Sequence, residues 1–311
     1  MRAVNGADLA ADESGAVLAF VALGLVVFLG CAAIAIDLGN VWAHRRAVST
    51  ATDAAALAAA QEYAVGGTGC SGVAADYVDR NLTDAVLSGC AHVTTGAGGR
   101  IDVGAAVDVQ HWFAPVLGIG SSDVVAETSA FYGSASGADG VRPIGLCAAS
   151  PAYTGWGGGL PSGEIFVPFE LTDPSPCGTG DIGAWALLGP WCGSAANAVA
   201  SGFPERITPY QPACVEQTDI GSVAQAVAAV RAAEEPVAIP IFELFGETTK
   251  IVALAGVEFT GPMVTEGAPG ELGVPIRFTT VVTTGDCCAA VDRGVRVVGI
   301  CRADGTGTRC P

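Results

Sequence analysis

The chain has 311 residues, and its 14 basic against 31 acidic residues give a formal net charge of −17 at pH 7. A nucleic-acid partner requires a basic patch that neutralises phosphates, and the sequence contains none, which excludes nucleic-acid binding. The length leaves room for a sizeable core or two small domains.

An apolar run from Gly15 to Ile36 follows a short polar tail of residues 1–14 and contains no charge, amide or proline. A helix of that length rises roughly 33 Å, enough to cross the hydrocarbon core of a bilayer. A buried helix of a soluble domain is rarely apolar on every face over such a length. We therefore predict a transmembrane helix over residues 15–36 that anchors the rest of the chain.

The helix is predicted to continue through residues 37–63, which are rich in alanine and lack proline. Gly39 is the weak point of this segment, and Gly66-Gly67 is expected to end it. Small residues recur on one face at helical spacing, starting from Val41 and Val48, and such a face packs closely on a sheet or another helix. The residues predicted to serve helix packing are Gly24, Gly30, Asp37, Gly39, Ala51, Ala55 and Ala58.

Residues 37–133 are predicted to form a pilin-like unit, in which this helix covers a small antiparallel sheet. A short amphipathic helix is expected over residues 73–87. Strands are expected over residues 92–95, 100–110 and 123–132. The second of these strands alternates Ile101, Val103, Ala105, Val107 and Val109, which is the period-two pattern of a half-buried strand.

Residues 134–141 have the composition of a flexible linker, and residues 142–311 are predicted to form an α+β, mostly β, outer domain. Turn-rich stretches cover residues 155–163, 173–183 and 201–214. One helix is expected over residues 222–233. Strands are expected over residues 237–245, 251–259, 274–284 and 295–300.

Eleven cysteines occur, and Cys31 lies within the apolar run. An even set spread through loop-like sequence predicts disulfides in an oxidising compartment, because no Cys-x-x-Cys spacing for a structural metal is present. A bridge between Cys70 and Cys90 would staple the short helix, and the adjacent Cys287 and Cys288 are each expected to reach another partner, with Cys301 and Cys310 as candidates. The disulfide candidates are Cys70, Cys90, Cys147, Cys177, Cys192, Cys214, Cys287, Cys288, Cys301 and Cys310.

These cysteines and the acidic outer region favour an amino terminus in the cytoplasm and an extracytoplasmic carboxyl-terminal domain. Arg45 and Arg46 follow the span, and by the positive-inside rule they favour the opposite orientation. We expect a single-pass protein of the cell membrane with its outer domain extracytoplasmic.

No signature of catalysis is found in the sequence: there is no Gly-x-Ser-x-Gly elbow, His-Glu-x-x-His pair or P-loop. His44, His92 and His111 lie near no nucleophile or metal motif, and we expect them to be structural. We predict no catalytic residue, no cofactor and no metal site. Trp156, Trp185 and Trp191 lie in glycine-rich stretches, where packing is favoured over a binding surface.

The start of the chain resembles the TadE/TadG-like proteins of tight-adherence, Flp-type pilus assembly. The residues that carry the resemblance are Glu13-Ser14-Gly15, Ala35-Ile36-Asp37-Leu38-Gly39, Arg45-Arg46 and residues 52–58. Residues 112–118, Trp-Phe-Ala-Pro-Val-Leu-Gly, with Ser129-Ala130-Phe131 after them, resemble the aromatic-rich turn of that family. The match to a prepilin cleavage site is incomplete, because the residue five after Gly6 is Ala11 and not glutamate.

The resemblance implies a bacterial, membrane-anchored and non-enzymatic component of Flp/Tad pilus assembly or secretion. It would work through contacts with other pilin-like or assembly proteins. The alternative is an anchored extracytoplasmic enzyme or ligand-binding protein with its site in residues 142–311.

Overall fold

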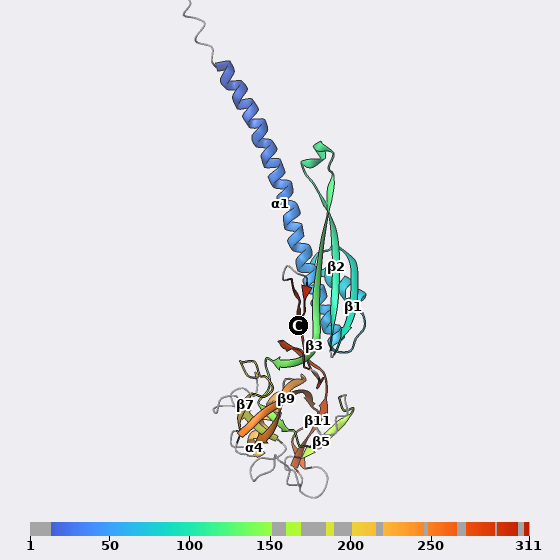
Figure 1. Cartoon of the computed structure of the whole chain (residues 1–311), viewed down its shortest axis with the longest axis vertical. Helices are drawn as coiled ribbons and strands as arrows, with labels where there is room; N and C mark the ends of the chain where they lie inside the picture. Colours follow the sequence, from blue (N-terminus) through green and yellow to red (C-terminus); the bar gives the residue numbers. More distant parts are fainter. Residues whose placement is uncertain are drawn as a thin grey trace, which may run out of the picture.

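The computed structural model describes residues 14–96, 98–150, 160–168, 185–189, 201–215, 220–245, 248–265, 272–289, 291–303 and 308–310. Figure 1 shows one long helix that stands out from a body of strands as a stalk. The strands form two main sheets, one beside the lower part of the helix and one beyond its carboxyl-terminal end. The predicted long apolar helix followed by a mostly β region is therefore confirmed.

Helix α1 (Ser14–Ala64) is continuous over 51 residues, so the predicted span and the alanine-rich segment are one element without a break at Gly39. The side chains from Val17 to Leu29 are exposed, and one helix among the described residues is long and apolar enough to cross a membrane. The helix ends where Gly66 takes a φ of 91°, a value that side chains other than glycine rarely adopt. The N–H of Gly67 donates to the carbonyl of Glu62 at 2.9 Å and satisfies the last turn.

Helix α2 (Cys70–Asn81) is shorter at its carboxyl end than the predicted 73–87 helix. Leu82 is already extended, and β1 (Val86–Thr95) begins four residues later. Val86 and Leu87 pair with Ala106 and Ala105 of the neighbouring strand, so this long-range pairing replaces the local helical preference. The predicted staple is confirmed, because a disulfide joins Cys70 to Cys90.

The first sheet has the order β1-β2-β3-β14-β12, with β13 paired to the end of β3. β2 (Gly98–Gln110) and β3 (Ser121–Ala138) form a long antiparallel hairpin in which Gln110 pairs with Ser121. The predicted alternation in β2 is confirmed by burial of every second side chain. The sheet core contains Ala55, Ala56, Ala59 and Ala60 of α1 together with Ile101, Val103, Ala105, Val107 and Val109.

The flexible linker predicted over residues 134–141 is wrong for most of its length, because β3 continues through Ala138. Ser134, Ala135 and Ala138 are buried. A Cβ added to Gly133 would lie 2.7 Å from the sulfurs of both Cys287 and Cys288. The small residues that suggested flexibility therefore serve close packing in this part of the fold.

The second sheet has the order β10-β11-β9-β7-β6-β4-β8, with β5 on β11, and β8 also pairs with β9. Because of that second pairing, five strands close into a ring (β9, β7, β6, β4 and β8). α4 (Ile220–Arg231) lies where a helix is predicted and contributes Ala226, Val227 and Val230 to the core of this sheet. The strand bounds are β4 (Ile144–Cys147), β5 (Glu164–Pro168), β6 (Trp185–Gly189), β7 (Pro212–Val215), β8 (Val237–Phe245), β9 (Thr248–Phe259), β10 (Val264–Thr265) and β11 (Leu272–Phe278).

The predicted strand over residues 274–284 is instead two strands in different sheets, β11 and β12 (Val281–Thr283). β12, β13 (Gly285–Cys287) and β14 (Val295–Ile300) all belong to the first sheet, and β14 pairs with β3. These three strands of the predicted outer domain thus complete the sheet that packs beside α1. A last hairpin consists of β15 (Arg302–Ala303) and β16 (Thr308–Arg309).

Two disulfide expectations are wrong. Cys287 and Cys288 are bonded to each other and not to separate partners, and Cys301 is bonded to Cys310. Cys147 also takes part in a disulfide, and Cys31 is free and exposed. Cys177, Cys192 and the turn-rich stretches 155–159 and 173–183 lie outside the described residues, as do Trp156 and Trp191.

Candidate functional site

The most specific polar contact between the helix and the first sheet is made by Asp37, the first charged residue after the apolar run. Its Oδ1 accepts a hydrogen bond from the backbone N–H of Trp112 at 2.8 Å. Its Oδ2 accepts from the N–H groups of Phe113 at 3.1 Å and Ala114 at 2.7 Å. These donors lie at the start of the 3₁₀ helix η1 (Ala114–Leu117), where backbone N–H groups have no acceptor within the helix.

The carboxylate of Asp37 is buried, with 6% of the residue exposed. Burial acts to raise the pKa of Asp37, but the hydrogen bonds from the backbone of Trp112, Ala114 and Phe113 outweigh it and lower the pKa overall. The charged form is therefore the one that holds the hairpin tip to the helix.

Further hydrogen bonds join α1 to the β2–β3 hairpin at successive positions along both elements. Asn40 Nδ2 donates to the carbonyl of Gln110 at 3.3 Å, beside the Asp37 contact. About three turns further along, the Thr52 hydroxyl lies 3.1 Å from that of Thr128, which donates to Asp53 at 2.7 Å. The hairpin thus has a fixed register along α1, and its turn reaches Asp37. Figure 1 shows the hairpin running beside the helix.

The predicted helix-packing residues fall into two groups. Ala51 and Ala55 are fully buried and Ala58 is 8% exposed, so this face is covered by the protein's own fold and is closed to a partner. Around Gly24, Gly30 and Gly39 a Cβ would meet nothing within 4 Å. Partner contacts through these glycines stay a prediction.

The carboxyl-terminal end of α1 is held by a residue from the far end of the chain. Arg296 of β14 donates from Nη1 to the carbonyl of Ala64 at 2.6 Å and is ion-paired with Asp292. A guanidinium suits this position because the last helical carbonyls have no N–H donor within the helix and carry partial negative charge. Near this end, His92 Nε2 lies 2.9 Å from the hydroxyl of Tyr132, and the Tyr63 ring lies 4.1 Å from the His92 ring.

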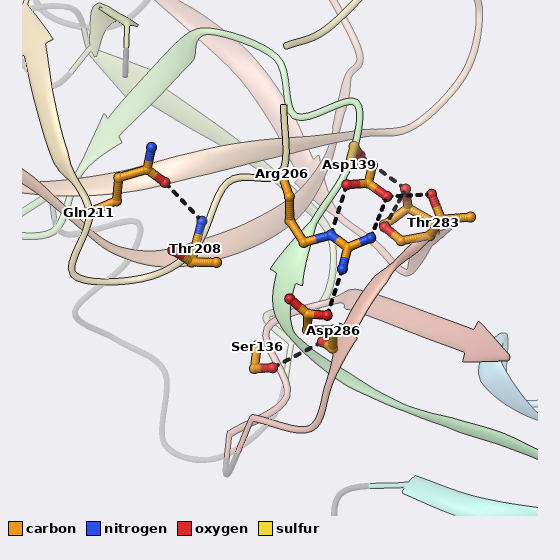
Figure 2. A network of polar contacts seen from close by, with 8 residues as sticks. Ser136, Asp139, Arg206, Thr208, Gln211, Thr283 and Asp286 are labelled. Carbon is orange, nitrogen blue, oxygen red and sulfur yellow. Dashed lines mark hydrogen bonds and ion pairs between the residues drawn. The ribbon is translucent and has the colours of Figure 1, made fainter. Parts of the chain in front are cut away.

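An arginine joins the end of β3 to the loop before β7. Arg206 donates to both carboxylate oxygens of Asp139, at 3.0 and 3.1 Å, and to Asp286 of β13 at 2.6 Å. Figure 2 shows its guanidinium between the two carboxylates. Thr284 donates to Asp139 at 2.8 Å. The network ties three segments that are distant in sequence at the junction of the two sheets.

This network gives a pH prediction. The hydrogen bond from Arg206 is the main cause that lowers the pKa of Asp139, and burial opposes it. A carboxyl whose pKa is lower in the folded state stabilises the protein at neutral pH, and this contribution is lost as the pH falls through the folded-state pKa. Asp139→Asn should lower the unfolding midpoint at pH 7 by roughly 1–3 °C, a small effect because the groups are partly exposed.

The difference between Asp139→Asn and the unsubstituted chain should shrink as the pH falls below about 4, the ordinary value for a carboxyl. This difference in unfolding midpoint is measured by thermal unfolding, monitored by circular dichroism, at several pH values. Asp79→Asn, at an exposed position of α2, is the matched control and should show no such pattern. A midpoint difference for Asp139→Asn that is equal at pH 3 and pH 7 would contradict the assignment.

Two of the histidines, His92 and His111, have hydrogen-bonding neighbours in the described part of the chain. His92 contacts Tyr132 as above, and His111 Nε2 lies 2.8 Å from the Ser122 hydroxyl. Among the described residues no group of three His, Cys, Asp or Glu side chains is placed to hold a metal ion. The sequence named Asp37 only as a packing residue and did not identify Asp139, Arg206 or Asp286. Arg206 is 67 residues from Asp139 and 80 residues from Asp286 in the chain. No local sequence pattern predicts contacts over such a separation.

Comparison with protein families gives a match on the long helix. Residues 15–62 match the family described as "Putative Flp pilus-assembly TadE/G-like". No curated protein and no solved structure matches the chain significantly. The matched segment contains the apolar run, Asp37, the arginine pair and the buried alanine face. Over this segment the chain is similar to the TadE/TadG-like proteins of Flp pilus assembly.

Proposed function

We propose that the protein is a non-enzymatic, membrane-anchored component of Flp/Tad pilus assembly that works through contacts with other pilin-like or assembly proteins. The observation that carries the proposal is that the family match lies on α1, whose first half presents apolar side chains on all sides. Such a surface is stable only when lipid or another apolar helix covers it. One face of the second half of α1 is already covered by the first sheet.

The proposed arrangement places the amino terminus in the cytoplasm and the two sheets outside the cell membrane. Three disulfides support an extracytoplasmic position of the sheets, because disulfides persist in oxidising compartments. They are Cys70–Cys90, Cys287–Cys288 and Cys301–Cys310. Partner contacts are proposed for the open faces of the span, including those around Gly24 and Gly30, where close approach of another helix is sterically free.

Photo-crosslinking in cells that carry the pilus genes tests the proposal. A photoreactive amino acid at Phe20 or Phe28, which are 79% and 74% exposed, should give crosslinks to pilin-like or assembly proteins that mass spectrometry identifies. The same probe at Val86, 70% exposed on β1, is the matched control for a position outside the span. Deletion of the gene should in parallel reduce surface pili.

Two outcomes would count against the role. One is that the crosslinked proteins are the same in cells that lack the other pilus genes. The other is that normal pili form in the deletion strain.

A further inference from the structure

We propose that the tip of the β2–β3 hairpin, residues 112–119, is a second membrane contact that inserts into the interfacial layer of the bilayer beside α1. The inference does not depend on the role in pilus assembly, since it concerns how the folded chain sits on lipid.

The tip is apolar and exposed. Residues 112–120 contain no charged side chain. Five large apolar side chains of this turn are exposed: Trp112 by 75%, Phe113 by 45%, Val116 by 87%, Leu117 by 76% and Ile119 by 52%. A contiguous apolar surface of this kind, with an aromatic pair, is costly in water and typical of a contact with lipid or protein.

The position of the tip indicates that lipid covers its apolar surface. Asp37, which holds the tip, immediately follows the apolar run, so the tip lies where α1 leaves the hydrocarbon core. Ala33, one turn nearer the membrane interior on the same helix face, is half-buried, whereas Ala35 is exposed. Figure 1 shows the hairpin rising beside α1 and ending at its middle. The exposed apolar surface of the tip is thus continuous with that of the span.

Polar residues occur at matching levels on both elements. Below the tip, the hairpin carries Asp108 and Asp123, which pair across β2 and β3. On the helix, Trp42 is 59% exposed and the guanidinium of Arg46 lies 5.0 Å from its ring centroid. Tryptophan and arginine are characteristic of the membrane–water interface. One plane therefore separates apolar from polar residues on the helix and on the hairpin together.

The backbone of the tip is also suited to a water-poor layer, where N–H groups without acceptors are costly. Asp37 accepts from the N–H groups of residues 112–114, and Pro115 has none to donate. The N–H groups of Val116, Gly118 and Ile119 donate to carbonyls within the turn at 3.0–3.2 Å. The pair His111 N–H to Gly120 C=O, at 3.0 Å, closes the base of the tip.

Spin labelling of the full-length chain tests the proposal. In a Cys31→Ala background with the disulfides intact, Val116→Cys carries a nitroxide label in nanodiscs of phosphatidylcholine that hold one protein each. The label should be accessible to oxygen, which partitions into lipid, and at least severalfold less accessible to a water-soluble nickel chelate than a label at Val93→Cys. Val93 is exposed at the other end of the sheet, opposite Arg100. Leu117→Cys provides a second labelled position if Val116→Cys folds poorly.

Two results would overturn the inference. Equal access of the nickel chelate to the labels at residues 116 and 93 would show that the tip is in water. Protection of the residue 116 label from both oxygen and the nickel chelate would show that protein, such as a second copy forced into the same disc, covers the tip in place of lipid. Either result would leave the crosslinking test of the pilus role unaffected.

Discussion

Arginines at Leu25 and Val26 together are expected to abolish stable membrane integration. The two residues lie at the centre of the apolar run, and each is exposed along α1, by 55% and 68%. An arginine at the centre of a spanning helix costs roughly 2.5–3.5 kcal/mol on translocon insertion scales, so the pair costs about twice that. The effect is expected to be large because no other part of the described fold buries this stretch of α1.

Membrane fractions washed with carbonate measure the result. The unsubstituted chain should stay in the pellet and the double variant should be released or degraded. Leu25→Val with Val26→Leu keeps the composition of the run and should behave as the unsubstituted chain. Arginine at the exposed Val86 controls for added charge outside the span. If the double variant is retained as well as these controls, α1 is not the anchor.

Ala55→Leu is expected to destabilise the contact between α1 and the first sheet. Ala55 has no exposed surface and lies in the core with Ile101 and Val103 of β2. A larger side chain in a close-packed interface forces backbone shifts or strained rotamers and typically costs about 1–3 kcal/mol. The hairpin would then lose its register on the helix, including the contact of Thr128 with Thr52 and Asp53.

Unfolding in mild detergent, followed by near-UV circular dichroism with the disulfides intact, measures this loss. Ala43→Leu is the matched control, since it makes the same change at an exposed position of the same helix. We expect Ala55→Leu to unfold several degrees earlier and Ala43→Leu to stay close to the unsubstituted chain. Identical unfolding of the two variants would mean that the helix does not pack tightly on the sheet.

Elements whose signal lies within a few neighbouring residues could be predicted from the amino-acid sequence. The apolar run and the alanine-rich segment predicted α1, because helix propensity and hydrophobicity act between residues a few positions apart. The alternation from Ile101 to Val109 predicted the buried face of β2 for the same reason. The similarity of residues 15–62 to a pilus-assembly family is also a property of local sequence.

Features that depend on residues distant in the chain became visible only in the folded structure. The stretch after Gly133 has the composition of a linker, but pairing with β13 and β14 makes it a strand. Cys287 and Cys288 bond to each other, a pairing that spacing alone argued against. Asp37 acquires its role only because a turn 75 to 77 residues away folds back to it. Such contacts form when the chain folds and brings distant segments together. The composition of one segment does not predict which distant segment it will contact.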